Sequence, residues 1–260
     1  MSIEFRGLKK RFGDHVVLDG VDLVVHEGET LALLGPSGTG KSVLLKHAIG
    51  LLEPDDGDVI VDGISIVTAT PAELAHVRKK VGYVFQNAAL FDSLTVAENL
   101  WLAQNEEGGS LTLENCRADA IELLGKVNLA PDVLVKYPAE LSGGMRKRVG
   151  VARAIASRPR YLLWDEPTTG LDPVNADNID ELIKEVSDEL GVTSIVVTHD
   201  LDTAFEAFVD RIALLYEGRV RASAPPSEIL LSDDPVVKRF VRRSRVEMNE
   251  ALGDRDARQK

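Results

Sequence analysis

A glycine-rich octapeptide near the N-terminus constrains the fold of this chain more than any other feature. Residues 35–42 read Gly-Pro-Ser-Gly-Thr-Gly-Lys-Ser and match the pattern G-x-x-x-x-G-K-[ST]. A continuous apolar run, Thr30–Leu34, precedes the octapeptide, and a segment with helical periodicity, Lys41–Ile49, follows it. A buried strand, a tight turn and a helix in this order are typical of a sheet with parallel strands. We therefore expect an α/β fold built around this turn.

The same octapeptide predicts a phosphate-binding loop. Its glycines let backbone N–H groups turn inward around phosphate oxygens, and the following helix directs its positive dipole end towards them. In this interpretation Lys41 reaches the β- and γ-phosphates of a nucleoside triphosphate, and the Ser42 hydroxyl binds Mg²⁺. The expected nucleotide ligands are Gly35, Pro36, Ser37, Gly38, Thr39, Gly40, Lys41 and Ser42.

A second buried strand is expected to deliver two carboxylates. The apolar run Tyr161–Trp164 is followed by Asp165 and Glu166. Open α/β sheets bind their ligands at the carboxyl ends of the strands. We expect Asp165 to hold the hydration shell of Mg²⁺ and Glu166 to accept a proton from an attacking water. Such a pair can also be a simple helix cap, and the phosphate loop favours the catalytic interpretation.

Two further features lie beside predicted elements. Residues 141–145, Leu-Ser-Gly-Gly-Met, form a second glycine-rich turn before the predicted helix Arg146–Ser157, which makes the turn a second possible anion site. Taken alone, the turn is better explained by Ser142 as an ordinary helix cap. His199 follows the predicted strand Thr193–Thr198, at the same sheet end as Asp165.

The order of these motifs resembles that of the ATP-binding cassette (ABC) ATPases, over residues 3 to about 222. The resemblance implies an α/β fold of the P-loop NTPase ABC ATPase type, with an antiparallel β subdomain and an inserted helical subdomain. It also implies a head-to-tail dimer, most simply a homodimer, that sandwiches two ATP molecules. The signature turn of one subunit, here Ser142, Gly143 and Gly144, then contacts the γ-phosphate held by the other subunit.

The resemblance assigns roles to isolated residues. Phe12 matches the aromatic residue that stacks on adenine. Gln86 matches a glutamine that touches Mg²⁺ and the attacking water and faces the membrane partner. Asp172 matches a residue that reaches across the dimer interface, and His199 matches the histidine that contacts the γ-phosphate.

The implied cofactors are ATP and Mg²⁺. The catalytic residues implied by the resemblance are Glu166, His199 and Lys41, and the magnesium ligands are Ser42, Gln86 and Asp165.

A helical block interrupts the α/β pattern between residues 95 and 157. We therefore predict an ATP-binding core with an antiparallel β layer from residues 1–86 and 158–222, and a helical subdomain at 87–157 that carries the signature turn. The strands expected in the antiparallel layer are Ile3–Leu8, Val16–Leu18 and Val21–Val25. Residues 223–260 are predicted to form a partly flexible C-terminal extension.

Charge and hydropathy exclude several classes of protein. The formal net charge of −12 argues against a general nucleic-acid binder. Residues 236–260 hold eight basic and four acidic side chains, a net +4, which predicts a solvated tail or a docking element. We find no signal peptide and no apolar run long enough to cross a membrane, and the single Cys116 suits a reducing compartment. We expect a cytoplasmic protein, held at the inner face of the cell membrane by a separate integral membrane permease.

The spacing of the motifs favours a transporter subunit among the ABC ATPases. Repair-type chains separate the two glycine-rich turns by long coiled coils, whereas Ser42 and Ser142 are 100 residues apart, and translation-type chains usually carry two cassettes.

Several segments resemble the ATPases of the Mla and Mce lipid transporters: 35–43, 85–91, 141–148 and 234–240. This resemblance predicts lipid transport with an MCE-domain or other lipid-binding partner. The alternatives are an amino-acid or other solute importer, and a non-transport ATPase that acts on a soluble partner.

Overall fold

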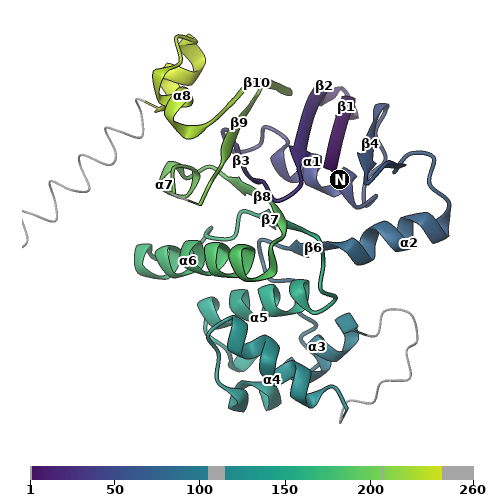
Figure 1. Cartoon of the computed structure of the whole chain (residues 1–260), viewed down its shortest axis with the longest axis vertical. Coiled ribbons are helices and arrows are strands. Elements are labelled where there is room, and N and C mark those ends of the chain that lie inside the picture. The colour runs from purple at the N-terminus through teal and green to yellow at the C-terminus, as the bar shows by residue number, and fades with distance from the viewer. Residues whose placement is uncertain (1, 105–114, 207, 242–260) are drawn as a thin grey trace, which may run out of the picture.

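Two β-sheets carry the fold of the computed structural model, which describes residues 2–104, 115–206 and 208–241 (Figure 1). The smaller sheet is antiparallel, with strand order β2-β1-β4-β5. Its strands are β1 (Ser2–Phe12), β2 (His15–His26), β4 (Asp56–Val61) and β5 (Ile64–Ser65). The larger sheet has the order β10-β9-β3-β8-β7-β6. Its strands are β3 (Thr30–Leu34), β6 (Val81–Val84), β7 (Tyr161–Asp165), β8 (Thr193–Thr198), β9 (Arg211–Tyr216) and β10 (Arg219–Ala224).

The predicted antiparallel layer is present, but the predicted division of its second strand is wrong. Val16–Leu18 and Val21–Val25 both belong to the single strand β2. Asp19, in the interruption between them, still pairs with Lys9 of β1. The β1–β2 ladder shifts register at three places, and bulges of this kind absorb extra residues without ending a strand.

Four neighbouring strands of the larger sheet, β3, β8, β7 and β6, are parallel and buried at every residue. Such strands have both faces covered, which is why each was visible in the sequence as an apolar run. Parallel pairing also brings their carboxyl ends to one edge of the sheet. The residues that meet at this edge are Leu34, Val84, Asp165 and Thr198.

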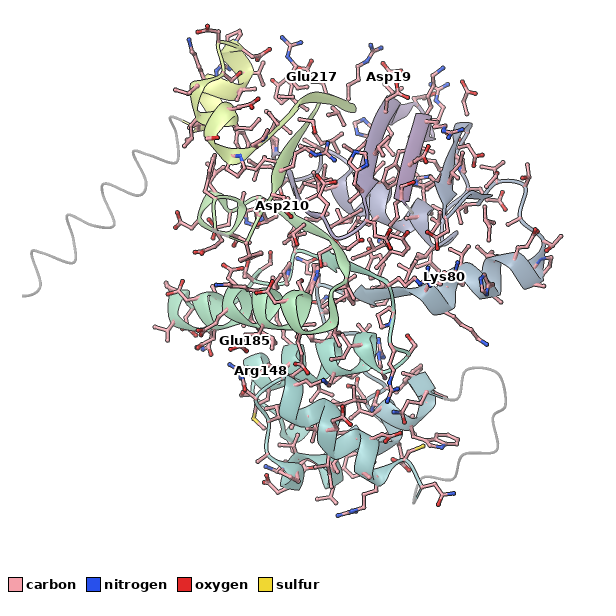
Figure 2. All side chains as sticks on the ribbon, viewed as in Figure 1. Asp19, Lys80, Arg148, Glu185, Asp210 and Glu217 are labelled. Atoms are coloured by element: carbon pink, nitrogen blue, oxygen red, sulfur yellow. The ribbon has the colours of Figure 1, made fainter. Side chains whose placement is uncertain are left out.

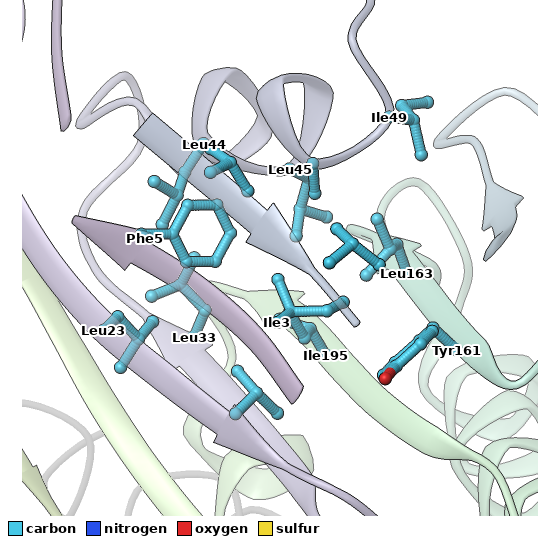
Figure 3. Close-up of a cluster of buried hydrophobic side chains, with 14 of the residues drawn as sticks. Ile3, Phe5, Leu23, Leu33, Leu44, Leu45, Ile49, Tyr161, Leu163 and Ile195 are labelled. Atoms are coloured by element: carbon cyan, nitrogen blue, oxygen red, sulfur yellow. The ribbon is translucent and has the colours of Figure 1, made fainter. Parts of the chain in front are cut away.

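A shared hydrophobic cluster joins the two sheets across helix α1 (Lys41–Ala48). Figure 3 shows Ile3 and Phe5 of β1 close to Leu33 of β3 and to Leu44 and Leu45 of α1. Since both sheets contribute to this cluster, α1 is held firmly at the point where the phosphate loop enters it.

Polar contacts fix the edges of this arrangement. The Asp210 carboxylate accepts a hydrogen bond from the Thr30 N–H at 2.8 Å, which joins the chain before β9 to the start of β3. Lys80, labelled in Figure 2, ends α2 (Pro71–Lys80). Its ammonium lies 2.9 Å from the Asp62 carboxylate after β4. This second contact joins the smaller sheet to the helix that leads into β6.

The remaining helices of the α/β part are α6 (Pro173–Leu190), α7 (Leu201–Ala204) and α8 (Pro226–Leu231). Helix α7 spans only four residues, and α8 lies in the segment predicted as a C-terminal extension. Val237 and Val241 are buried in a cluster with β3, β9 and α8, so the start of the basic segment packs on the fold and is not simply a solvated tail. The rest of that segment, residues 242–260, lies outside the described residues.

The helical block consists of α3 (Val96–Gln104), α4 (Arg117–Lys126), the 3₁₀ turns Pro131–Val135 and Pro138–Glu140, and α5 (Gly143–Ile155). These helices gather beside α6, away from the antiparallel sheet (Figure 1). They share one hydrophobic cluster with β7, β8 and α6, so the block does not have a core of its own.

Helix α5 begins three residues earlier than the sequence predicts. Ser142 is its N-cap, and the Ser142 hydroxyl accepts a hydrogen bond from the Met145 N–H at 3.2 Å. Gly143 and Gly144 therefore lie in the first helical turn, because the cap offsets the low helix propensity of glycine.

Candidate functional site

The phosphate loop requires glycine at two positions for steric reasons. A Cβ atom on Gly35 would lie 2.4 Å from the Leu215 carbonyl oxygen of β9. Gly40 has φ +95°, and a Cβ atom there would lie 2.7 Å from the Val17 side chain. The loop is thus pressed between β9 and β2, and only glycine allows the backbone to turn in this space.

Lys41 occupies the centre of this loop and is only 3% exposed. Its Nζ donates hydrogen bonds to the carbonyl oxygens of Gly35 at 2.8 Å and Pro36 at 3.0 Å. Burial lowers the pKa of the Lys41 ammonium, and the nearby Glu166 carboxylate opposes this effect. The N-cap of α1, Gly40, offers no side-chain cap to the first helical turn. The N–H groups of that turn can therefore be satisfied by phosphate oxygens.

The Ser42 hydroxyl and the Asp165 carboxylate, two oxygen groups suited to Mg²⁺, lie side by side at the end of β7. The Ser42 hydroxyl donates to Asp165 Oδ1 at 2.5 Å, and the Tyr83 hydroxyl donates to Asp165 Oδ2 at 2.8 Å. Within the described residues, no three His, Cys, Asp or Glu side chains gather as a metal site. Mg²⁺ commonly takes one or two protein oxygens together with substrate phosphates and water, and Ser42 and Asp165 fit that pattern.

Tyr83 is a site residue that sequence reasoning missed. It lies in β6 and pairs with Leu163 of the neighbouring strand β7. Burial raises the pKa of the Tyr83 hydroxyl, which therefore stays protonated and keeps donating to Asp165. The available signal was a lone phenol within the apolar run Val81–Phe85.

Glu166 has an unusual backbone and a crowded carboxylate. Its φ is +49°, a left-handed conformation that non-glycine residues rarely adopt. Glu166 Oε2 accepts hydrogen bonds from Thr169 Oγ1 at 3.1 Å and from Gln86 Nε2 at 3.4 Å. Glu166 Oε1 lies 3.7 Å from both Lys41 Nζ and His199 Nδ1. Strained backbone of this kind persists only where surrounding contacts hold it, often at functional sites.

The structure thus brings together the residues predicted at the carboxyl edge of the sheet. Lys41, Gln86 and His199 all lie next to Glu166, and Ser42 contacts Asp165. These contacts create a polar cluster that can hold a phosphate chain and a metal ion and can direct a carboxylate at a water molecule.

Other predicted residues lie away from this cluster. Ser142 caps α5 and Gly143 and Gly144 begin it, and among the described residues no hydrogen bond joins these three to the phosphate loop. Asp172 caps α6 by accepting from the Asn175 N–H at 3.2 Å. Phe12 ends β1 with 49% exposure, and Lys10 Nζ lies 5.6 Å from the centre of its ring. Their roles toward adenine and a second subunit stay predictions.

A family model described as ABC transporter matches residues 18–169 of this chain. This span contains the phosphate loop, the turn at 141–145 and the carboxylate pair, and it covers more than half of the chain. The chain belongs to the ABC transporter family. It is therefore the ATP-hydrolysing subunit of an ABC transporter, and the expectation drawn from the order of the motifs is confirmed at this level.

This ABC transporter subunit is similar to proteins named for the transport of different solutes. It is 39% identical over 246 residues to the probable ribonucleotide transport ATP-binding protein mkl of Mycobacterium tuberculosis, covering 95% of this chain and 68% of that protein. It is 40% identical over 225 residues to the methionine import ATP-binding protein MetN of Carboxydothermus hydrogenoformans, covering 86% and 66%. Neither name mentions lipid, so the likeness to the Mla and Mce group stays a prediction.

Solved structures of ABC cassettes confirm the fold class. The ATP-binding cassette MJ0796, solved as a dimer in a post-hydrolysis state with ADP and Pi, matches with a TM-score of 0.77 and 34% identity. The match covers 86% of this chain and 98% of that one. The part of this ABC transporter subunit that the structure describes contains no helix long and apolar enough to span a bilayer.

Proposed function

We propose that this subunit hydrolyses ATP at Glu166 as part of a head-to-tail homodimer and drives a separate membrane permease whose cargo is lipid. The observation that carries the proposal is the convergence of Lys41, Gln86 and His199 on Glu166, beside the Ser42–Asp165 pair. A transporter ATPase needs a phosphate cradle, a magnesium-binding carboxylate and a base for water, and these residues supply all three.

Each residue of the cluster has a task in phosphoryl transfer to water. Lys41 and the N–H groups of the loop bind the β- and γ-phosphates and spread their charge. Ser42 and Asp165 would hold Mg²⁺, which when bound would neutralise charge that develops on the phosphates. Glu166 orients a water and accepts its proton, while Gln86 and His199 fix the geometry around the Glu166 carboxylate.

The signature turn is proposed to act on the ATP of a second copy of this chain. Among the described residues, Ser142, Gly143 and Gly144 form no hydrogen bond with the phosphate loop of their own chain. Ser142 is exposed and is the N-cap of α5. An exposed helix N-terminus with glycines suits contact with a phosphate from outside. The dimeric cassette with ADP and Pi supports this arrangement by analogy.

A groove beside Gln86 is suited to a contact with the permease. It has a volume of about 590 Å³ and lies between the end of α1, strand β6 and the helical block. Leu51 and Phe91 line it and are each 51% exposed, and Phe85 directly precedes Gln86. Gln86 donates a hydrogen bond to the Glu166 carboxylate. A partner bound in this groove would contact Phe85, the residue before Gln86, and would therefore lie close to the catalytic carboxylate.

The lipid cargo rests on the segments that resemble Mla and Mce ATPases. The relatives named for ribonucleotide transport and methionine import keep a solute importer as the second candidate. In either case we propose that the subunit is peripheral on the cytoplasmic face of the membrane.

The test is to purify the complex from membranes through a tag on this chain and to identify its partners by mass spectrometry. An integral permease with an MCE-domain protein supports lipid transport. A permease with a solute-binding protein contradicts the lipid assignment and favours the importer. A soluble partner without any permease contradicts the transport proposal as a whole.

A further inference from the structure

Lys147 of α5, the helix that begins at the signature turn, binds the loop that follows Glu166. It lies in the second turn of α5, and its partly buried side chain extends from the helical block to the loop at Pro167 and Thr169. Lys147 Nζ donates hydrogen bonds to the carbonyl oxygens of Pro167 at 2.5 Å and of Thr169 at 2.8 Å. One ammonium therefore binds two carbonyls of the segment that directly follows the catalytic carboxylate.

The bound segment in turn holds the Glu166 side chain. Thr169 Oγ1 donates to Glu166 Oε2 at 3.1 Å, and the Thr169 N–H donates to the Glu166 carbonyl at 3.3 Å. Glu166 itself has the left-handed φ of +49°. Because this conformation is intrinsically unfavourable, the loop needs outside contacts to keep it, and Lys147 supplies two of them.

Burial and a neighbouring carboxylate act in opposite directions on the charge of Lys147. Burial lowers the pKa of the Lys147 ammonium, and the negative charge of Glu166 acts in the opposite direction. Its basic neighbours have other partners: Arg146 donates to the Leu141 carbonyl and Arg148 to the Val127 carbonyl, both within the helical block. Lys147 is thus the member of this basic triplet that reaches the loop.

We propose that Lys147 is a positioning residue for Glu166, and that it transmits the docking of the signature turn on a partner's ATP to the catalytic carboxylate of its own chain. The second half rests on the proposed function, because it requires the head-to-tail dimer. Any displacement of α5 by contact at Ser142 reaches Pro167 and Thr169 through Lys147, and from Thr169 it reaches Glu166.

The test compares Lys147→Met, which keeps the length of the side chain and removes the donor, with Lys147→Arg, which restores it. Lys126→Met is the matched control. Lys126 also links the helical block to the α/β part, through Glu189 of α6, but it does so away from Glu166. Steady-state ATP hydrolysis gives kcat, KM and the Hill coefficient, and sedimentation reports the ATP-dependent dimer.

We expect Lys147→Met to lower kcat about 10- to 100-fold, because misplacement of a reacting group by about 1 Å has an effect of that size. KM should stay close to wild type, the ATP-dependent dimer should form at least as readily as in the wild type because its ATP is consumed more slowly, and the Hill coefficient should fall towards 1. Lys147→Arg should recover most of the rate, and Lys126→Met should behave as wild type.

The proposal is overturned if Lys147→Met keeps the wild-type kcat. It is also overturned if Lys147→Met loses the dimer together with the rate, because Lys147 would then act in the signature turn or in folding. A Hill coefficient that does not change, or that already equals 1 in the wild type, would refute the transmission. If the wild type neither hydrolyses ATP nor forms a dimer, the proposed function fails instead.

Discussion

Asp180 of α6 is a buried carboxyl group whose titration should be visible in the stability of the protein. Its residue exposure is 9%, and Thr203 Oγ1 of α7 donates to Asp180 Oδ2 at 2.8 Å. Asp180 Oδ1 has no hydrogen-bond partner among the described residues. Burial raises the pKa of Asp180 to about 7; the Thr203 hydrogen bond opposes this rise, and the nearby Asp200, Glu206 and Asp177 charges add to it.

The sign of the effect follows from the order of the two pKa values. The folded-state pKa of about 7 lies above the ordinary pKa of 3.8 that applies to Asp180 in the unfolded chain, so the folded state binds the extra proton between these two pH values. The stability contributed by neutral Asp180 is therefore present at low pH and is lost as the pH rises towards the folded pKa. Between about pH 6 and pH 8, the linkage relation gives a loss of about 1.4 kcal/mol in the free energy of unfolding.

The assay is urea unfolding of the wild type, Asp180→Asn and Asp188→Asn at both pH values. Asp180→Asn keeps an oxygen acceptor for Thr203 and removes the titration, so it should lose about 1.4 kcal/mol less than the wild type between the two pH values. Asp188 is an exposed carboxylate on the same helix and is not among the charges that act on Asp180, so its replacement should leave the wild-type difference nearly unchanged. Other titrating groups are common to all three proteins and cancel. Equal losses in Asp180→Asn and the wild type would refute the reasoning.

Three further substitutions test the geometry of the site. Gly35→Ala places a Cβ atom 2.4 Å from the Leu215 carbonyl and should cost about 1–3 kcal/mol and weaken ATP binding. Gly38→Ala is the control: its Cβ atom meets open space, and the φ of +80° should cost only about 1–2 kcal/mol in the free energy of unfolding. Denaturant unfolding and nucleotide titration measure both variants. Equal ATP affinities of Gly35→Ala and Gly38→Ala would contradict the steric role of Gly35. Tyr83→Phe removes one hydrogen bond from Asp165 and should destabilise the protein by about 1 kcal/mol and raise the Mg²⁺ concentration for half-maximal ATP hydrolysis. An unchanged Mg²⁺ requirement would show that Tyr83 does not set the position of Asp165.

The sequence predicted the centre of the site because its residues follow directly from strand ends. Gly35, Asp165 and His199 each come directly after or at the end of a buried parallel strand, and parallel strands bring such positions to one edge. The local pattern of an apolar run followed by a polar residue was therefore enough to place them together.

Residues that support the site could not be found in the same way. Tyr83 lies within a strand, Thr169 in a loop and Lys147 on a helix, and each contacts the site only through tertiary packing. No spacing in the chain encodes these contacts. The continuous strand β2 was missed for a related reason, since its bulges depend on pairing with β1.

The most direct test of ATP hydrolysis at Glu166 is the behaviour of Glu166→Gln with ATP and Mg²⁺. We expect turnover to fall by at least about 100-fold, because the base for the attacking water is lost. ATP binding should persist, and the dimer should accumulate in sedimentation because its ATP is not consumed. Lys41→Ala, which removes the buried ammonium from the phosphate loop, should instead lose binding or turnover without trapping a dimer. Hydrolysis by Glu166→Gln at the wild-type rate would contradict the assignment of this carboxylate as the catalytic base.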